Sequence, residues 1–173
     1  MRRKQLETER LYFSFWSEEE EDSQRAEKLW GNPNVTKFIA QKGNLSKEQV
    51  AQRLQLEIDS QATAGFQYWP IFLKDGEKFV GCCGLHAYDL ENHVAELGFH
   101  LVPDAWGKGL AKEAAAAVID YARSSTDLTA LFAGHHPENQ GSAKVLSKLG
   151  FQFQGNQYYE PTGLDHPSYL LKF

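Results

Sequence analysis

A short glycine-containing segment carries the clearest chemical signal in the sequence. Residues 106–112 read Trp-Gly-Lys-Gly-Leu-Ala-Lys and join an expected strand to an expected helix. Two glycines let the backbone turn sharply, and the first N–H groups of a helix have no partner inside it. Unpaired N–H groups and the helix dipole both attract negative charge, so this segment suits a phosphate. Lys108 and Lys112 would add positive charge to such an anion site.

The same two glycines also fit a tight turn that binds nothing. A dinucleotide-binding fingerprint would need Gly or Ala where Lys112 stands and would normally lie in the first strand-to-helix turn. A nucleoside-triphosphate loop would need Gly-Lys followed by Ser or Thr after four spacer residues, and that string is missing from the sequence. Both nucleotide motifs therefore fit poorly.

Length and charge limit the classes of protein to consider. The chain has 173 residues, with 18 Lys and Arg against 23 Asp and Glu, which predicts one domain spanning residues 1–173. A net charge of -5 gives no global attraction for nucleic acid or an anionic membrane, so we expect neither partner. Cys82 and Cys83 are adjacent and too close for the usual disulfide geometry. The sequence has no apolar run long enough to span a membrane, so we expect a cytoplasmic protein.

The first half of the chain predicts a strand, two helices and an antiparallel sheet. Helices are expected after Ser17, at an acidic run ended by residues 30–33, and after Ser46, where Gln49 completes a capping box. Alternating apolar residues predict strands at residues 6–15, 66–73, 78–85 and 94–102, with a hairpin turn at Asp75-Gly76.

The second half alternates helices and strands. A helix follows Gly109, a strand covers residues 128–134, and Asn139 caps a helix that Gly150 ends. A terminal hairpin is expected over residues 151–159 and 168–173. The fold class is therefore α+β: a mixed, mostly antiparallel central sheet with flanking helices, in which residues 94–102 and 128–134 form a parallel pair.

Two sequence blocks together resemble the GNAT N-acetyltransferase superfamily, in its ribosomal-protein (RimJ/RimL-like) branch. Residues 96–101 and 103–114 are similar to the acetyl-CoA-binding segment, and residues 139–142 through 148–151 to a second block of that branch. Residues 7–11 and 32–35 also resemble the branch, so the likeness spans nearly the whole chain. Two positions depart from it: Trp106 replaces the usual Gln or Arg, and Leu146 replaces a helix tyrosine that protonates the thiolate.

The resemblance implies acetyl-CoA as co-substrate, no metal, and a splayed parallel strand pair that admits the pantetheine arm. A backbone N–H group near Phe99, His100 or Leu101 would meet the thioester carbonyl. The implied diphosphate site is the whole glycine-containing loop, formed by Trp106, Gly107, Lys108, Gly109, Leu110, Ala111 and Lys112.

Glu96 and Ser142 are the catalytic candidates that the resemblance implies. Glu96 would take the proton of the acceptor amine, directly or through water, and its alternative role is a structural carboxylate. Ser142 would donate a hydrogen bond to the sulfur, and Asn139 would bond the pantetheine amide while capping its helix. If Glu96 is not the base, Glu160, Asp165 or His166 come next.

Histidines and aromatic residues elsewhere carry weaker signals. His135 and His136 lack a metal-ligand pattern around them, and His86, His93 and His100 either shuttle protons near the cleft or serve as structural groups. The candidates for an acceptor pocket, with core packing as the alternative, are Phe38, Trp69, Tyr88, Tyr158 and Tyr159.

We therefore expect an acetyl-CoA-dependent N-acetyltransferase, acting as a monomer or homodimer, with a protein or peptide N-terminal α-amine as first-ranked acceptor. An α-amine has an unperturbed pKa of about 7.7–8.0 against ~10.4 for lysine, so it loses its proton more easily. The alternatives are a small-molecule amine as acceptor, a non-catalytic acyl-CoA-binding regulatory domain, and, last, a dinucleotide-binding module.

Overall fold

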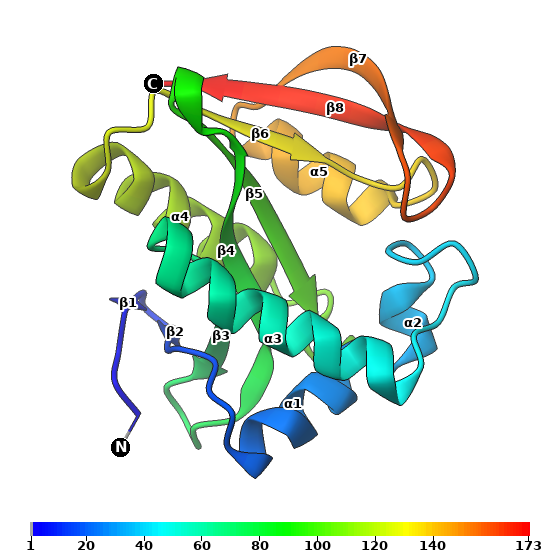
Figure 1. Cartoon of the computed structure of the whole chain (residues 1–173). Coiled ribbons are helices and arrows are strands. Elements are labelled where there is room, and N and C mark those ends of the chain that lie inside the picture. The colour runs from blue at the N-terminus through cyan, green and yellow to red at the C-terminus, as the bar shows by residue number, and fades with distance from the viewer. Residues whose placement is uncertain (1) are drawn as a thin grey trace.

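An eight-stranded sheet runs through the computed structural model, which describes residues 2–173 (Figure 1). The strands are β1 (Leu6–Glu7), β2 (Leu11–Phe13), β3 (Tyr68–Leu73), β4 (Phe79–Asp89), β5 (Val94–Leu101), β6 (Ala130–Gly134), β7 (Gln152–Tyr159) and β8 (Leu164–Lys172). They lie in the order β1-β2-β3-β4-β5-β6-β8-β7, and among these strands of residues 2–173 only the neighbours β5 and β6 are parallel. The predicted fold class is confirmed.

Helices cover both faces of this sheet. They are α1 (Glu20–Trp30), α2 (Pro33–Thr36), α3 (Lys47–Ala64), α4 (Leu110–Ser125) and α5 (Gln140–Lys148), with short 3₁₀ turns at Leu90–Asn92 and Pro103–Ala105. In Figure 1, α1 and α3 lie on one side of β4 and β5 and α4 lies on the other.

The first predicted strand, residues 6–15, is wrong as a single element. The chain folds back between β1 and β2, and Leu6 pairs with Phe13 in a small antiparallel hairpin. The hydroxyl of Thr8 accepts the N–H of Leu11, and a carboxylate from α4, Glu113, accepts the N–H of Arg10. These bonds capture N–H groups that a continuous strand would have offered to its neighbour.

The predicted N-cap of the first helix is also wrong. Glu19 holds the cap position without a side-chain cap bond, and Ser17 instead gives its N–H and hydroxyl to the carboxylate of Asp22. Asp22 is fully buried and also binds Arg2 and Arg25, so it is the stronger partner for Ser17. The short helix α2 was not predicted.

Most remaining elements agree with expectation, but the last strand begins at Leu164 instead of residue 168, so Pro167 lies inside β8, opposite Asn156. Ser46 and Gln49 form the predicted capping box of α3, and Gly65 ends that helix with a φ of +82°. β3 and β4 form the predicted antiparallel pair, Asn139 caps α5, and Gly150 follows the helix in a left-handed conformation.

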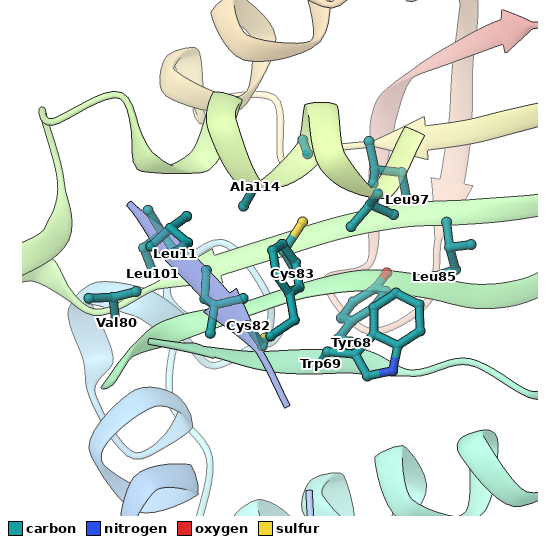
Figure 2. Close-up of a cluster of buried hydrophobic side chains, with 14 of the residues drawn as sticks. Leu11, Tyr68, Trp69, Val80, Cys82, Cys83, Leu85, Leu97, Leu101 and Ala114 are labelled. Carbon is teal, nitrogen blue, oxygen red and sulfur yellow. The ribbon is translucent and has the colours of Figure 1, made fainter. Parts of the chain in front are cut away.

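The hydrophobic core fills both faces of the sheet, packed against α4 on one face and against α1 and α3 on the other. Figure 2 shows side chains of β3, β4 and β5 gathered beneath Ala114 of α4, with Cys83 and Leu97 among them. Cys82 and Cys83 are buried free thiols, and burial raises both pKa values, so neither is an available nucleophile. Within residues 2–173, no helix is long and apolar enough to cross a membrane.

Candidate active site

A cavity of about 880 Å³ opens where β5 and β6 part. It brings together nearly all of the predicted site residues: Glu96, Phe99, His100, Leu101, Trp106, Gly107, Gly109, Leu110, Ala111, Lys112, Asn139 and Ser142 all line it. Lys108 is the exception: it is exposed and is not among the residues that line the cavity.

The parallel strand pair is short, and this creates the opening. β5 and β6 pair only from Val94 with Ala130 to Glu96 with Phe132. β5 continues to Leu101 and β6 to Gly134, so their backbones diverge beyond that point. Phe99 to Leu101 stay paired with β4 on one side, and on the other side, where β6 has moved away, their backbone borders the cavity.

The glycine-containing loop has the backbone conformation that the sequence predicted. Gly107 and Gly109 have φ values of +72° and +74°, which favour glycine, and Gly109 is the N-cap residue of α4. No side chain caps this helix, so its first N–H groups are available to an anion at the cavity.

Two contacts that the sequence did not reveal hold the loop. The indole N–H of Trp106 donates to the carbonyl of Leu101 at 2.9 Å. Arg10 donates to the Lys108 carbonyl at 2.9 Å and forms an ion pair with Glu113 at 2.6 Å. Burial opposes ionisation of Glu113, but hydrogen bonds from Thr8 and Arg10 outweigh it and lower its pKa.

At the start of α5, Asn139 accepts the N–H of Ser142 at 3.1 Å. The hydroxyl of Ser142 has no partner among the described residues and borders the cavity, so it can donate to a ligand there. Leu146, where the expected family pattern has a tyrosine, is buried and lines the same cavity.

Glu96 lines the end of the cavity that lies away from the glycine-containing loop. Burial raises its pKa, although nearby His86, a hydrogen bond from Tyr68 and the charge of Arg53 act in the opposite direction. The Tyr68 hydroxyl donates to Glu96 Oε1 at 3.2 Å. Tyr68 can cross β5 there because residue 98 is glycine: a Cβ atom would lie 2.2 Å from the phenol oxygen.

A buried polar cluster lies behind Tyr68. Glu57 of α3, fully buried, binds Arg53 at 3.0 Å, His86 at 2.8 Å and the backbone N–H of Tyr68 at 2.7 Å. Sequence reasoning did not identify Glu57 or Arg53. The available signal was a carboxylate three residues after Leu54, on the apolar face of the helix.

The weaker candidates separate into two groups. Phe38, Tyr88, Tyr158 and Tyr159 line the cavity, whereas Trp69 is fully buried against Tyr121 in the core. His86, His135, His136 and His166 also line it, whereas Glu160, Asp165 and His93 lie outside the lining.

His100 occupies the cavity wall as a structural group. The indole of Trp30 donates to its Nδ1 atom at 3.1 Å, and burial lowers its pKa to about 3. Its imidazole therefore stays neutral, with Nδ1 held by Trp30.

The charges on the lining are unevenly distributed. Glu96 is the single carboxylate among the described residues that line the cavity. Arg53, Lys112, Lys144 and Lys148 supply the cationic groups. The three lysines belong to α4 and α5 beside the glycine-containing loop, whereas Arg53 belongs to α3 beside Tyr68.

Comparisons with known proteins agree with this geometry. The family model described as "Acetyltransferase (GNAT) domain" matches residues 10–152. "Uncharacterized N-acetyltransferase p20" of Bacillus licheniformis is 34% identical over 150 residues, covering 87% of this chain and 83% of that protein.

Two solved structures have the same fold. A GNAT-family acetyltransferase from Bacillus anthracis has a TM-score of 0.80 and 25% identity, covering 96% of this chain and 97% of that one. RimL, named as a ribosomal L7/L12 alpha-N-protein acetyltransferase and solved with coenzyme A, has a TM-score of 0.75 and 19% identity, covering 95% of each chain. The chain is an N-acetyltransferase of the GNAT family, and its relatives are consistent with the RimJ/RimL-like branch.

Proposed function

We propose that this chain transfers the acetyl group of acetyl-CoA directly to a primary amine, with a protein or peptide N-terminal α-amine as acceptor. The observation that carries the proposal is the parting of β5 and β6 beside the glycine-containing loop. Members of the GNAT family use acetyl-CoA. The gap between β5 and β6 suits its pantetheine arm, and the glycine-containing loop suits its diphosphate.

The coenzyme end of the cavity fits a diphosphate joined to an extended arm. The uncapped start of α4 and the glycines at 107 and 109 offer backbone N–H groups, and Lys112 adds a positive charge. Beyond Glu96, the backbone of β5 can pair with amide groups of the pantetheine arm in place of β6. Lys108 has no direct part in this proposal, because its side chain lies outside the lining.

Catalysis is assigned to groups at the junction of the two ends. Glu96 accepts a proton from the amine, and the rise in its pKa through burial suits a base working near neutrality. A backbone N–H between Phe99 and Leu101 stabilises the oxygen of the reacting carbonyl. Ser142 donates a hydrogen bond to the departing sulfur, a role made more important by Leu146 in the tyrosine position.

The charge of the acceptor end favours an amine with one positive charge. A polyamine or amine antibiotic carries several ammonium groups, and a site for it would need several carboxylates. Glu96 is the single carboxylate of the described lining, so a second ammonium group would find no carboxylate partner there. A peptide N-terminus brings one amine and adjacent carbonyl groups, and Arg53 can donate to a carbonyl. RimL, named as an alpha-N-protein acetyltransferase, shares the fold.

A small-molecule amine remains the second candidate acceptor. An amino acid has one amine beside a carboxylate, so the Arg53 guanidinium would accommodate it as well as a peptide. The two acceptors differ in length, and peptides but not amino acids would gain affinity from further residues.

Mass spectrometry of products tests the proposal. The protein is incubated with acetyl-CoA and a mixture of peptides with free N-termini, matched peptides with blocked N-termini, amino acids and polyamines. Acetylation of the free-N-terminus peptides at the α-amine is the expected result. Acetylation confined to amino acids or polyamines would overturn the acceptor assignment, and coenzyme binding without any product would support the non-catalytic alternative.

A further inference from the structure

His86 has a setting that the assignment of Glu96 as base leaves unexplained. Its Nε2 atom lies 2.8 Å and 3.0 Å from the two carboxylate oxygens of Glu57. That carboxylate also accepts from the backbone N–H of Tyr68 and from Arg53. A carboxylate that already receives donors acts only as an acceptor, so the proton of the neutral imidazole lies on Nε2.

The other ring nitrogen of His86 is therefore a free proton acceptor. Nδ1 has no hydrogen-bond partner among the described residues. It is also absent from the buried side-chain atoms that lack a partner, so this nitrogen is accessible. His86 lines the cavity. A histidine whose one nitrogen is held by a buried carboxylate and whose other nitrogen faces a cleft has the arrangement of an oriented general base.

The ring of His86 is also held in a defined plane. It stacks on the phenol of Tyr68 with a centroid separation of 3.6 Å and an angle of 3°. Glu57 fixes the edge of the imidazole ring and Tyr68 fixes its face. The side chain of His86 therefore has little conformational freedom left to lose when it takes up a proton.

His86 lies next to the assigned base. In the β4–β5 ladder it is directly opposite Glu96, and side chains of opposed residues stand on the same face of a sheet. The Tyr68 hydroxyl donates to Glu96, so one residue contacts both groups. Two proton acceptors thus stand side by side at the acceptor end of the cavity.

We infer that His86, oriented by Glu57, is a second proton acceptor of the acetyl transfer, working beside Glu96. An acceptor that arrives as an ammonium group must break two N–H bonds. The first proton moves to Nδ1 of His86, and the freed electron pair of nitrogen forms the bond to the acetyl carbon.

The rest of the reaction balances with one proton released. The carbon–sulfur bond breaks and its electron pair leaves with sulfur, while the second N–H proton moves to Glu96. One of the two protons returns to sulfur, and the other leaves from His86 to solvent. Glu57 is a positioning residue in this scheme, because it acts through the imidazole.

Within residues 2–173, the surroundings of His86 offer no competing carboxylate besides Glu57 and Glu96. The titratable and charged groups packed near it come from α3, β3, β5 and β7: Arg53, Glu57, Tyr68, Glu96, His100 and Tyr159. His100 is neutral, and burial raises the pKa values of Tyr68 and Tyr159, so these three do not titrate beside His86 near neutrality.

The inference rests on the proposed function, and kinetics of single variants test it. The measurements are kcat and the acetyl-CoA Kd for wild type, H86Q, E57Q and H93Q, with the acceptor peptide identified by mass spectrometry. We expect H86Q to lower kcat by about 100-fold with an unchanged Kd, because glutamine keeps a donor to Glu57 but cannot take a proton. E57Q should lower kcat by about tenfold.

H93Q is the matched control. His93 is a half-exposed histidine paired with Asp127 and lies outside the cavity lining, so its replacement should leave kcat unchanged. A second readout is rescue by free imidazole, which should restore part of the turnover of H86A and none of that of E96Q. If H86Q does not fold, this rescue alone decides: restored turnover supports the inference and its absence overturns it.

The possible failures are distinguishable. Turnover by H86Q at the wild-type rate, with its pH profile unaltered, would overturn the role of His86 and leave the proposed function standing. A wild-type protein that acetylates no amine in any mixture would overturn the proposed function and this inference with it.

Discussion

The two ends of the cavity are built in different ways. At the coenzyme end, the groups proposed to meet the ligand come from two short segments: backbone N–H groups of residues 106–112, and the side chains of Asn139 and Ser142 in residues 139–142. At the acceptor end, they are side chains carried by α3, β3, β4 and β5, with Arg53, Tyr68, His86 and Glu96 brought together by the sheet. One end is therefore specified locally and the other by tertiary packing.

This difference separates binding from turnover. Backbone N–H groups at a helix start suit any ligand with a diphosphate, so the coenzyme end can stay the same while the reaction changes. The acceptor end sets the charge and shape that an amine must have, and a single substitution there changes the chemistry. Variants at the acceptor end should lose kcat and keep their affinity for the coenzyme, whereas variants at the coenzyme end should lose that affinity.

The largest effect is expected at Glu96. E96Q should lower kcat by about 100-fold or more, because general-base catalysis contributes roughly this factor. Because burial raises the pKa of Glu96, the wild-type rate should fall as pH drops through that raised value, and E96Q should lose this acid limb. A kcat–pH profile and calorimetry with acetyl-CoA measure both, and an altered Kd would show that the two ends are not separable.

The opposite failure is expected at Gly109. In G109V, a β-branched residue would have to adopt a φ near +74° at the start of α4, which displaces the N–H groups there. Loss of an anion interaction of about 2 kcal/mol corresponds to a roughly 30-fold weaker Kd for coenzyme A.

G76V is the matched control for this strain. Gly76 has a φ of +73° in the β3–β4 turn, and nothing lies within 4 Å of a Cβ atom there. Both variants should lose about 1–3 kcal/mol of unfolding free energy, but only G109V should lose coenzyme affinity in titration calorimetry. Equal affinities for the two variants would count against the loop as the diphosphate site.

A smaller effect is expected at Tyr68. Y68F removes the hydroxyl that donates to Glu96 while keeping the ring that stacks on His86. The hydrogen bond favours the charged carboxylate, so its loss should raise the pKa of Glu96 and move the acid limb of kcat to higher pH. Turnover at neutral pH should fall by no more than about tenfold. An acid limb that stays in place would mean that another group produces it.

The smallest effect is expected at Trp106. W106F removes the indole donor to the Leu101 carbonyl, a hydrogen bond with a net contribution of about 1 kcal/mol. Coenzyme Kd should weaken by roughly fivefold with kcat unchanged, since this bond holds the loop rather than the reacting groups. A loss of kcat without a loss of affinity would place Trp106 in the chemistry and contradict the division between the two ends.

The same difference between local signals and tertiary packing explains how much of the fold and of the site could be predicted from the sequence. The turn at the glycine-containing loop and the caps at Ser46 and Asn139 are local signals whose backbone conformations were predicted correctly, whereas the loop's part in binding a diphosphate stays a prediction. Ser17 was misread as a cap because Asp22, a partner held by Arg2 and Arg25, competes for it. Propensity alone does not show which donors tertiary structure supplies.

The acceptor end could be predicted only in part. Glu96 was found through the family resemblance, but its contacts with Tyr68 and the fixing of His86 by Glu57 depend on the strand register and on how α3 packs. Residues 57 and 86 are 29 apart in the sequence, and no local pattern joins them. The charged residue on the apolar face of α3 was the one signal available, because a carboxylate there must find partners.

The exposure of Trp106 has a practical consequence. Of the four tryptophans, Trp16, Trp30 and Trp69 are no more than 4% exposed, whereas Trp106 is 47% exposed and belongs to the glycine-containing loop. Collisional quenchers in solution should therefore extinguish the emission of this one indole preferentially. A ligand seated on the loop would shield it, so the chain carries its own optical reporter of coenzyme occupancy, independent of any turnover.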